Sequence, residues 1–452
     1  MTPGQMLTNQ RIRAIRALNT RGIRLLHIAD VTVIYLTLML ITAFMAVFPR
    51  WNAWAHVGER YWWSYGVIAF IHLAVFYFGG LYDREPRLRS RIRLPKIVAL
   101  VWVSSLIAGV VSLMLGEFLI PRSILVIFAM VAPLGIAANR VISRRLQLHA
   151  LGPPRVLLVG TDDEVRLATS HLELSDDVDI AGSTASVAEL EKYVEETGAT
   201  DVLLLDGEYL GDLYTGSLER LEAKGVGALQ VVGAQDSLLG LRNVGEIGGI
   251  PFVGLAAHVL PPSQERLKRL MDLAILTLIL PVVIPTLLFT TGYVAVVVGR
   301  PLLFVQDRVG KDGRPFAMLK FRSMPPNVEA GTGPVQARRH DPRVLRGMHW
   351  IRQTRLDELP QLWNVARGQM SIVGPRPERP QELAAYERLF PGYRRRHQVP
   401  PGITGLAQVY GYAETDIEYK LGHDLHYLAN WSPILDLQII GRSTWVIISR
   451  RG

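Results

Sequence analysis

The sequence predicts a mixed membrane protein with an N-terminal four-helix transmembrane bundle, an α/β middle domain and a C-terminal α/β-type domain that contains a re-entrant membrane helix. Three observations predict this fold class: four apolar runs near the N-terminus, alternating strand and helix patterns in the middle, and a later apolar run with basic flanks. They divide the chain into residues 1–150, 151–260 and 261–452.

The composition favours contact with anionic partners. The 452 residues carry a formal net charge of +9, and 49% of them are hydrophobic while only 20% are charged. Such a chain can meet lipid headgroups, phosphates or nucleic acid. It contains no cysteine, which excludes disulfides, zinc–thiolate sites and cysteine nucleophiles.

Four apolar runs predict the bundle, and they cover 29–48, 61–82, 96–118 and 123–139. Each is close to the ~20 residues that a spanning helix needs. The loops on one side contain fourteen basic residues and the loops on the other side contain three, so the N-terminus and everything after residue 140 are expected in the cytoplasm. The opposite side gathers four tryptophans: Trp51, Trp54, Trp62 and Trp63. A buried soluble four-helix core is the alternative, and the charge asymmetry argues against it.

The middle segment predicts a parallel α/β sheet of the Rossmann-like type. Strands are expected at 154–161, 201–206 and 228–233, with a helix at 186–197. A dinucleotide site needs G-x-G-x-x-G after the first strand. Here Asp162 stands at the second glycine position and two more acidic residues follow, which would repel a pyrophosphate. We therefore expect a structural or regulatory scaffold without an NAD site.

The apolar run at 270–299 predicts a re-entrant membrane helix. Both flanks are basic, so both ends prefer the same side of the membrane. Pro281 and Pro285 lie near the middle, and we expect Pro281 to break the helix. A kinked helix that enters one leaflet and returns satisfies both facts, while an ordinary bent fifth span is the alternative.

The segment after residue 300 combines turns with cationic groups. Gln306–Gly313 predicts a hairpin, because Asp312-Gly313 favours a tight turn, and Lys320 and Arg322 lie on the next strand. Further on, Pro360 favours the first position of a helix that Gly368 can end. This places the adjacent carboxyls Asp357 and Glu358 just before a helix N-terminus.

Two readings of this acidic pair are open. The simpler one is a solvated helix start, where acidic residues are common. The other is phosphoryl chemistry on a lipid, since carboxylates hold Mg²⁺ and can attack phosphorus to give an acyl phosphate. Arg376 lies between two prolines, and a guanidinium on so restricted a backbone suits bidentate phosphate binding.

A series of motifs runs across residues 266–445. In order they are R-L-K-R-L-M-D, the Pro281 break, V-Q-D-R-V-G-K-D-G-R-P-F-A-M-L-K-F-R-S-M, D-P-R, R-L-D-E-L-P-Q-L-W-N-V, M-S-I-V-G-P-R-P, P-P-G-I-T-G-L-A-Q-V and D-L-H-Y-L-A-N-W-S. In these motifs the chain resembles the monotopic phosphoglycosyl transferases of bacteria. In architecture it resembles their large members, such as undecaprenyl-phosphate galactose or glucose phosphotransferases.

The resemblance implies an activity and a location. The expected reaction moves a sugar 1-phosphate from a UDP-sugar to undecaprenyl phosphate, with release of UMP, and begins the assembly of exopolysaccharide, capsule or O-antigen. The expected location is the bacterial inner membrane, with the catalytic domain on its cytoplasmic face. Membrane lipids and a second copy in a homodimer are the other implied partners, and no nucleic acid is expected.

The resemblance also assigns roles to residues. Asp357 matches the nucleophile that forms a phosphosugar–aspartyl intermediate, Glu358 matches its assisting partner, and both match the Mg²⁺ ligands. The phosphate-binding candidates are Arg352, Arg376, Lys320, Arg322, Gln306 and Arg308. The chain departs from the family pattern at three positions, where serine, glycine and a basic residue are frequent: Arg355, Met348 and His349.

Two expectations concern the C-terminal part. Arg394–Arg396 is expected to form a lipid-headgroup patch, and Trp431–Arg450 to pack against the re-entrant helix or lie on the membrane.

Two other functions are alternatives to the transferase. A membrane nucleotide-sugar dehydratase or epimerase would need a glycine-rich cofactor loop and Tyr-x-x-x-Lys, which the sequence lacks. A non-catalytic scaffold or regulator of polysaccharide assembly would tolerate loss of the acidic pair, which is intact. The sequence does not identify the sugar.

Overall fold

The computed structural model describes twelve stretches of the chain: residues 25–46, 58–83, 87–89, 93–115, 119–173, 175, 178–233, 244–256, 260–325, 341–390, 392–410 and 416–449. The chain divides into two compact units. The first comprises residues 1–209 and 220–255, and the second comprises residues 210–219 and 256–452. The expected division into three domains stays a prediction.

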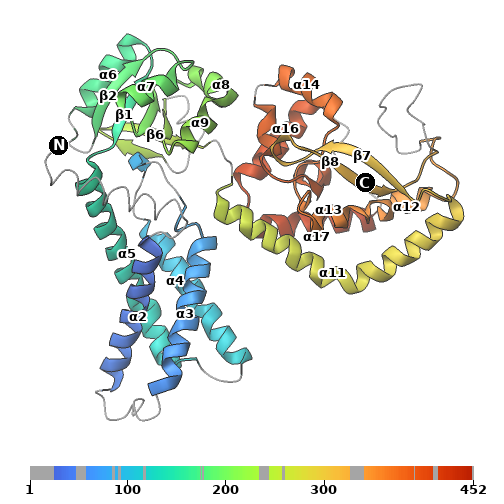
Figure 1. Ribbon diagram of the computed structural model, residues 1–452, viewed down its shortest axis with the longest axis horizontal. Coiled ribbons are helices and arrows are strands. Elements are labelled where there is room, and N and C mark those ends of the chain that lie inside the picture. Colours follow the sequence, from blue (N-terminus) through green and yellow to red (C-terminus); the bar gives the residue numbers. More distant parts are fainter. Residues whose placement is uncertain are drawn as a thin grey trace, which may run out of the picture. The chain divides into compact units, whose positions relative to one another are not determined.

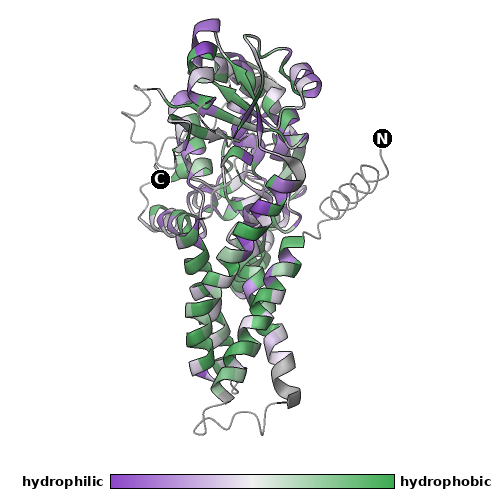
Figure 2. Ribbon diagram, turned by 90° about the vertical axis from the view of Figure 1, so that its left-hand side faces the viewer, coloured by the Kyte–Doolittle hydropathy of each residue, from purple (hydrophilic) through white to green (hydrophobic). Residues whose placement is uncertain are grey.

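The four expected helices of the bundle are present in the first unit (Figure 1): α2 (Leu25–Ala46), α3 (Gly58–Phe78), α4 (Leu94–Met114) and α5 (Arg122–Leu151). Helix α2 packs on α3 and α5, and α4 also packs on both of these. Ile34, Phe76 and Phe128 are buried between them, while Leu106 and Leu134 are exposed. Helices that are apolar both inside and outside are typical of a membrane, and Figure 2 colours these helices mostly as hydrophobic.

Length and composition alone let α2, α4 and α5 cross a membrane, whereas α3 has a shorter apolar stretch, Trp63–Phe78. Trp63 is exposed, as an interfacial tryptophan would be. The side chains of the other expected belt residues, Trp51, Trp54 and Trp62, lie outside the described residues, as do the basic residues of 11–24. The orientation of the bundle therefore stays a prediction.

The connection between α3 and α4 joins the bundle to the middle sheet. It contains a short 3-10 helix, η2 (Arg87–Arg89), whose Leu88 is buried against the hydrophobic core of that sheet. The Arg87 side chain donates to the carbonyl of Gly152 at 2.9 Å. At the neighbouring end of the bundle, Asp30 accepts from Arg140 at 2.6 Å and from the Tyr82 hydroxyl at 2.8 Å.

The middle sheet has six strands in the order β2-β1-β3-β4-β6-β5. The strands are β1 (Arg155–Val159), β2 (Asp179–Thr184), β3 (Asp201–Leu204), β4 (Gly227–Val231), β5 (Gly245–Ile247) and β6 (Ile250–Leu255). The helical segments are α6 (Asp162–Leu172), α7 (Leu190–Thr197), η3 (Gly207–Tyr209), α8 (Leu210–Asp212), η4 (Leu213–Ser217) and α9 (Leu218–Ala223). The three expected strands, β1, β3 and β4, and the expected helix, α7, are thereby confirmed.

The expectation of a purely parallel sheet is wrong at one edge. Strands β2, β1, β3 and β4 pair in parallel, but β6 pairs antiparallel with both β4 and β5. The turn between β5 and β6 is Gly248-Gly249, with φ of 55° and 80° at the two residues. Two glycines with positive φ form a tight hairpin turn. That Gly-Gly pair was the signal in the sequence for this missed hairpin.

The first turn after β1 holds three carboxyl groups at the start of α6: Asp162, Asp163 and Glu164. The Glu164 carboxylate accepts from the Thr161 backbone N–H at 2.8 Å and so caps its own helix. A Cβ atom on Gly160 would lie 2.8 Å from this carboxylate. The helix N-terminus that would bind a pyrophosphate is therefore occupied by the chain's own acid. Independence from NAD stays a prediction.

The second unit contains the C-terminal elements. Its helices are α11 (Pro262–Val297), α12 (His349–Gln353), α13 (Gln361–Ala366), α14 (Pro380–Leu389), α15 (Leu406–Val409), α16 (Ile417–Ala429) and α17 (Pro433–Ile448), with 3-10 helices η5 (Lys311–Gly313), η6 (Leu356–Glu358) and η7 (Tyr393–Gln398). Its strands are β7 (Leu303–Val309), β8 (Pro315–Phe321), β9 (Ser371–Val373) and β10 (Gly402–Thr404). Strands β7 and β8 form the expected hairpin, in which Asp312 and Gly313 have positive φ.

Helix α11 is longer than expected and is not broken. It spans 36 residues and contains both Pro281 and Pro285 in its interior. The expectation that Pro281 breaks the helix is wrong, because the helix continues through it; the expected kink is present as a change of direction near the middle of the helix (Figure 1). An interior proline removes one backbone hydrogen bond and clashes with the preceding turn, which bends a helix whose flanking turns remain intact.

The N-terminal part of α11 is anchored in the second unit by three polar residues. Lys268 donates to Asp436 at 2.8 Å, Arg269 donates to the carbonyl of Ala366 at 2.7 Å, and Asp272 accepts from the Ser371 hydroxyl at 3.0 Å. Lys268 and Asp272 are buried. These residues belong to the R-L-K-R-L-M-D motif, so that motif fixes the start of the helix to the folded domain.

The C-terminal part of α11 returns to the same unit. The Tyr293 hydroxyl donates to the carbonyl of Gly347 at 3.1 Å, and the Arg322 guanidinium donates to the carbonyl of Val298 at 2.8 Å. Between the two anchored ends the helix is apolar and exposed, and the Leu278 side chain reaches 79% exposure. Two ends held by one domain around an uncovered apolar middle are compatible with a re-entrant helix. By length and composition α11 could also cross a membrane, so re-entry stays a prediction.

Helix α17 packs against the start of α11. Trp431 and Ile439 are buried in a core that also contacts Leu267 of α11. Ile434 and Trp445 are exposed. Of the two expectations for Trp431–Arg450, packing against α11 is confirmed for the part of this stretch that the structure describes.

Removal of the Lys268 charge is expected to destabilise the second unit. In Lys268→Met the buried Asp436 loses its cation, which costs about 3 kcal/mol. The matched control is Lys311→Met, because Lys311 pairs with Glu265 while both side chains remain about one-third exposed. That change should cost less than about 1 kcal/mol. Thermal unfolding of the purified variants measures the difference, and equal shifts in melting temperature would contradict it.

Candidate functional site

The acidic pair lies where the sequence placed it, immediately before a helix. Arg355 has a φ of 58°, which is unusual for a residue with a side chain, and it turns the chain into η6. Asp357 and Glu358 are the last two residues of η6, and α13 follows. Pro360 is the residue before α13 instead of its first residue, and Gly368, with a φ of 79°, follows its end.

Glu358 is held by two cations. Its Oε1 accepts from the Lys320 Nζ at 2.9 Å and lies 3.5 Å from an Arg355 guanidinium nitrogen. Burial by itself would raise the pKa of Glu358, but Lys320, Arg355 and Arg376 outweigh burial and hold the pKa well below its usual value. Glu358 is therefore a fixed, ionised carboxylate.

Asp357 has the opposite environment. The residue is only 9% exposed, and its buried Oδ1 has no hydrogen-bond partner among the described residues. Burial and the neighbouring Glu358 charge raise its pKa, and Lys320, Arg352 and Arg355 only partly offset them. The two adjacent carboxyls are thus unequal. Glu358 forms ion pairs with cations, whereas Asp357 keeps an oxygen without a hydrogen-bond partner among the described residues.

A small pocket opens beside Glu358. It is lined by Arg308, Met318, Lys320, Glu358, Gln361, Arg376, Pro377, Gly402 and Ile403. Three of these side chains are cationic and one is a carboxylate that already pairs with Lys320. The excess positive charge suits a ligand with several phosphate oxygens.

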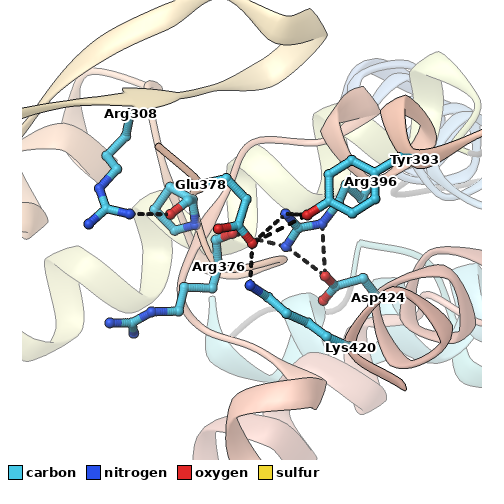
Figure 3. A network of polar contacts seen from close by, with 8 residues as sticks. Arg308, Arg376, Glu378, Tyr393, Arg396, Lys420 and Asp424 are labelled. Carbon is cyan, nitrogen blue, oxygen red and sulfur yellow. Dashed lines mark hydrogen bonds and ion pairs between the residues drawn. The ribbon is translucent and has the colours of Figure 1, made fainter. Parts of the chain in front are cut away.

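Arg308 and Arg376 present two guanidinium groups on one side of the P-R-P segment (Figure 3). The Gln306 amide oxygen accepts from Arg308 at 2.7 Å and 3.1 Å, so Gln306 orients this arginine. Burial, together with the nearby charges of Arg376 and Arg379, lowers the pKa of Arg308 to about 10, which leaves it charged at neutral pH. The Arg376 guanidinium has no hydrogen-bond or ion-pair partner in the described part of the chain.

The structure separates two other expected phosphate-binding residues from this pocket lining. Arg352 lies on α12, where its charge acts on Asp357. Arg322 donates to the carbonyls of Val298 and Gly299 and so caps the end of α11. Pro281 lies within α11. In this structure the Arg322 guanidinium holds the end of α11. A role for Arg322 in binding phosphate stays a prediction.

A buried charged cluster that was not predicted from the sequence lies next to Arg376. It consists of Glu378, Tyr393, Arg396, Lys420 and Asp424 (Figure 3). Burial would raise the pKa of Glu378, but Arg396 and Lys420 lower it to about 2. The expected headgroup patch is wrong for Arg396, whose side chain has 0% exposure, and holds in exposure only for Arg394, which is 80% exposed. The signal was Asp424, which stands in the quoted motif D-L-H-Y-L-A-N-W-S, because a buried acid there needs a cation.

The pair Asp357 and Glu358 can contribute to a Mg²⁺ site. No group of three or more His, Cys, Asp or Glu side chains suited to a metal occurs among the residues that the structure describes. Mg²⁺ is nevertheless commonly bound by one or two carboxylates together with substrate phosphates and water. The buried, unpartnered Oδ1 of Asp357 fits such a ligand.

Comparison with known proteins gives one family and several relatives. The family model described as bacterial sugar transferase matches residues 263–450. A UDP-glucose:undecaprenyl-phosphate glucose-1-phosphate transferase from Klebsiella pneumoniae is 43% identical over 200 residues, which make up 43% of this chain and 43% of that protein. A UDP-N-acetylgalactosamine-undecaprenyl-phosphate N-acetylgalactosaminephosphotransferase from Aeromonas hydrophila is 40% identical over 194 residues, 42% of this chain and 46% of the relative.

A third relative is matched over most of its length. The exopolysaccharide production protein PSS from Rhizobium leguminosarum bv. phaseoli is 40% identical over 182 residues, which are 38% of this chain and 91% of the relative. The matches with the first two relatives, in contrast, span less than half of their length. The similarity thus covers a segment large enough to be a whole protein elsewhere.

Proposed function

Because the chain belongs to the bacterial sugar transferase family, we propose that it transfers a sugar 1-phosphate from a UDP-sugar to undecaprenyl phosphate and releases UMP. The observation that carries this proposal is the unequal carboxyl pair beside a cationic pocket. Glu358 forms an ion pair with Lys320, and Asp357 has a buried oxygen without a hydrogen-bond partner among the described residues. Arg308 and Arg376 line the pocket and can bind phosphate oxygens.

The proposed reaction has two displacements at the same phosphorus. The Asp357 carboxylate attacks the β-phosphorus of the UDP-sugar, a new P–O bond forms, and the bond to the α-phosphate breaks as UMP leaves. The phosphosugar is then held on Asp357 as an acyl phosphate. A phosphate oxygen of undecaprenyl phosphate attacks that phosphorus, the bond to Asp357 breaks, and the lipid-linked diphosphate sugar departs. Both attacking oxygens are anionic, so neither step requires a general base.

The residues around Asp357 have separate tasks in this proposal. Arg308 and Arg376 bind the diphosphate oxygens, and Gln306 keeps Arg308 in place. Lys320 holds Glu358 ionised, and Arg352 adds positive charge near Asp357. Asp357 and Glu358 would also hold Mg²⁺, which supplies charge neutralisation at the phosphates when bound. The buried position of Asp357 keeps water away from the acyl phosphate.

The membrane placement is part of the proposal. Helices α2 to α5 would cross the inner membrane, and α11 would enter its cytoplasmic leaflet and return. Both anchored ends of α11 contact the domain that carries Asp357, and its middle offers apolar side chains to lipid. The active site then lies at the interface, where the phosphate of a polyprenyl lipid is found.

Two further parts of the proposal concern assembly and partners. The product would begin the assembly of exopolysaccharide, capsule or O-antigen, with membrane lipids around the helices and no nucleic acid involved. A homodimer is expected from the resemblance to the large family members. Light scattering corrected for detergent checks it, and a monomeric mass would remove this expectation.

The test of the activity is a panel of UDP-sugars. Detergent-solubilised protein is incubated with each UDP-sugar, Mg²⁺ and undecaprenyl phosphate, and UMP is quantified. With at least one UDP-sugar we expect catalytic turnover, seen as repeated release of UMP. This turnover should require both undecaprenyl phosphate and Mg²⁺. A protein that releases no UMP from glucose, galactose or N-acetylated UDP-sugars would be a scaffold instead.

The rate should depend on pH through Asp357. The nucleophile must be ionised, and its pKa is raised above the usual aspartate value, so kcat/KM should fall as pH drops through that raised pKa. Arg355→Gln removes a cation that lowers this pKa, and the acid limb should therefore move to higher pH. Arg367→Gln is the control, because Arg367 is exposed and stacks on Trp363. An acid limb that stays in place in Arg355→Gln would contradict the assignment.

A further inference from the structure

The segment that carries Arg376 is held along its backbone by four separate contacts. The carbonyl of Pro375 accepts from the Gly402 N–H at 2.9 Å, and that of Pro377 accepts from the Arg308 guanidinium at 3.0 Å. The carbonyl of Glu378 accepts from the Val309 N–H at 2.9 Å. Prolines on both sides already restrict the backbone of Arg376. The position of this residue is therefore strongly determined.

The fourth contact comes from Arg396. Its Nη2 donates to the carbonyl of Arg376 at 3.0 Å, and the same nitrogen donates to Asp424 at 2.7 Å. Its Nη1 donates to Glu378 at 2.9 Å and to the Tyr393 hydroxyl at 3.0 Å. One guanidinium thus joins the backbone of Arg376, the next acid along the chain and an acid from α16. A planar fork with five donors can do this, and an ammonium cannot.

The cluster is balanced in charge but is costly to bury. Glu378 and Asp424 offset Arg396 and Lys420, and Lys420 itself pairs with Glu378. Burying such ion pairs gives little net stability compared with apolar side chains of the same volume. What the arrangement provides is geometry: Figure 3 shows the Arg376 guanidinium pointing away from the cluster, on the side of Arg308.

We propose that Arg396 is a positioning residue, held by Glu378 and Asp424, that fixes the backbone of Arg376 so that its guanidinium meets the diphosphate of the donor. This inference rests on the proposed function, since the diphosphate is that of the UDP-sugar. Arg396 itself has no exposed atom through which to touch a substrate, because its side chain is fully buried. It acts only through Arg376.

A double-mutant cycle tests this. Affinity for UDP with Mg²⁺ is measured by titration calorimetry on the full-length protein for the wild type, Arg396→Lys, Arg376→Ala and the double variant. Arg396→Lys keeps the charge but loses the fork, and it should weaken UDP binding about tenfold. In the Arg376→Ala background the same change should weaken binding by less than about twofold. An equal loss in both backgrounds would mean a merely structural role and would overturn the inference.

Two further variants serve as a control and as a replacement for Arg396→Lys. Arg394→Lys makes the same substitution on the same 3-10 helix outside the cluster, at an exposed residue paired with Glu387, and should bind UDP like the wild type. If Arg396→Lys does not fold by melting temperature, Asp424→Asn replaces it in the cycle, since the amide weakens the hold on Arg396 and leaves its contact with Glu378. A loss that is additive with Arg376→Ala in that cycle would equally overturn the inference.

The double-mutant cycle tests the positioning role of Arg396, and the turnover assay tests the proposed reaction, so either claim can be contradicted without the other. Coupling between Arg396 and Arg376 in UDP binding, without UMP release from any UDP-sugar, keeps the positioning role and removes the proposed reaction. Turnover of a UDP-sugar with additive effects does the opposite. Absence of UDP binding by the wild-type protein would overturn both.

Discussion

Replacement of Asp357 by asparagine is expected to abolish turnover while the protein remains folded. The amide has the shape of the carboxylate, but it is not a competent nucleophile and binds Mg²⁺ poorly. We expect a loss of at least about 1,000-fold in the rate of UMP release, as for other covalent nucleophiles. Retention of more than a few per cent of the activity would contradict the assignment of Asp357.

The matched control for this substitution is Asp312→Asn. Asp312 is exposed at the turn of the β7–β8 hairpin and has a φ of 55°, a conformation that asparagine also tolerates. This variant should retain wild-type activity. Both variants replace an aspartate by the isosteric asparagine in the same unit. Their comparison separates the chemistry of Asp357 from a general effect of losing a carboxylate.

The intermediate gives a second readout for Asp357. Wild-type protein incubated with UDP-sugar and Mg²⁺ but without undecaprenyl phosphate should release at most one equivalent of UMP and gain the mass of one phosphosugar. Intact-mass spectrometry should show this adduct on the wild type and on Asp312→Asn, but not on Asp357→Asn. An adduct on Asp357→Asn would assign the nucleophile to another residue.

The second large effect concerns the side of the membrane on which α11 ends. We expect single cysteines placed before and after α11 to be equally protected from a membrane-impermeant thiol reagent in intact cells, because a re-entrant helix leaves both on the cytoplasmic side. The chain has no cysteine of its own, so each introduced thiol is the only target. Ala256 and Ala317 are suitable positions, since both are exposed alanines flanking the helix.

Positions for this experiment need the structure as well as the sequence. Ser263 precedes the apolar run but is only 1% exposed, so a cysteine there would be unreactive on either side of a membrane. Asn52→Cys, in the loop predicted to lie outside, is the positive control that should react in intact cells. Both Ala256→Cys and Ala317→Cys should react once the cells are opened. Reaction of Ala317→Cys alone in intact cells would mean that α11 crosses the membrane.

The sequence by itself determined the features that depend on local chemistry. Long apolar runs predicted the bundle helices, because the length and polarity of a helix in lipid are set by its own residues. Asp312-Gly313 predicted the β7–β8 turn, because positive φ is a property of those two residues. The place of Asp357 and Glu358 ahead of a helix followed from Pro360 and Gly368 in the same way.

Only the tertiary structure decided which partner each polar group has. Lys320 and Arg322 are two residues apart on β8, yet one binds Glu358 and the other caps α11. Arg394 and Arg396 are equally close in sequence, yet one is exposed and the other is buried between Glu378 and Asp424. These partners come from distant segments, and so do the contacts that hold both ends of the bent α11 in one domain. Local propensity carries no information about contacts formed across the fold, and that is why the pairing of charges around Arg376 could be read only from the folded chain.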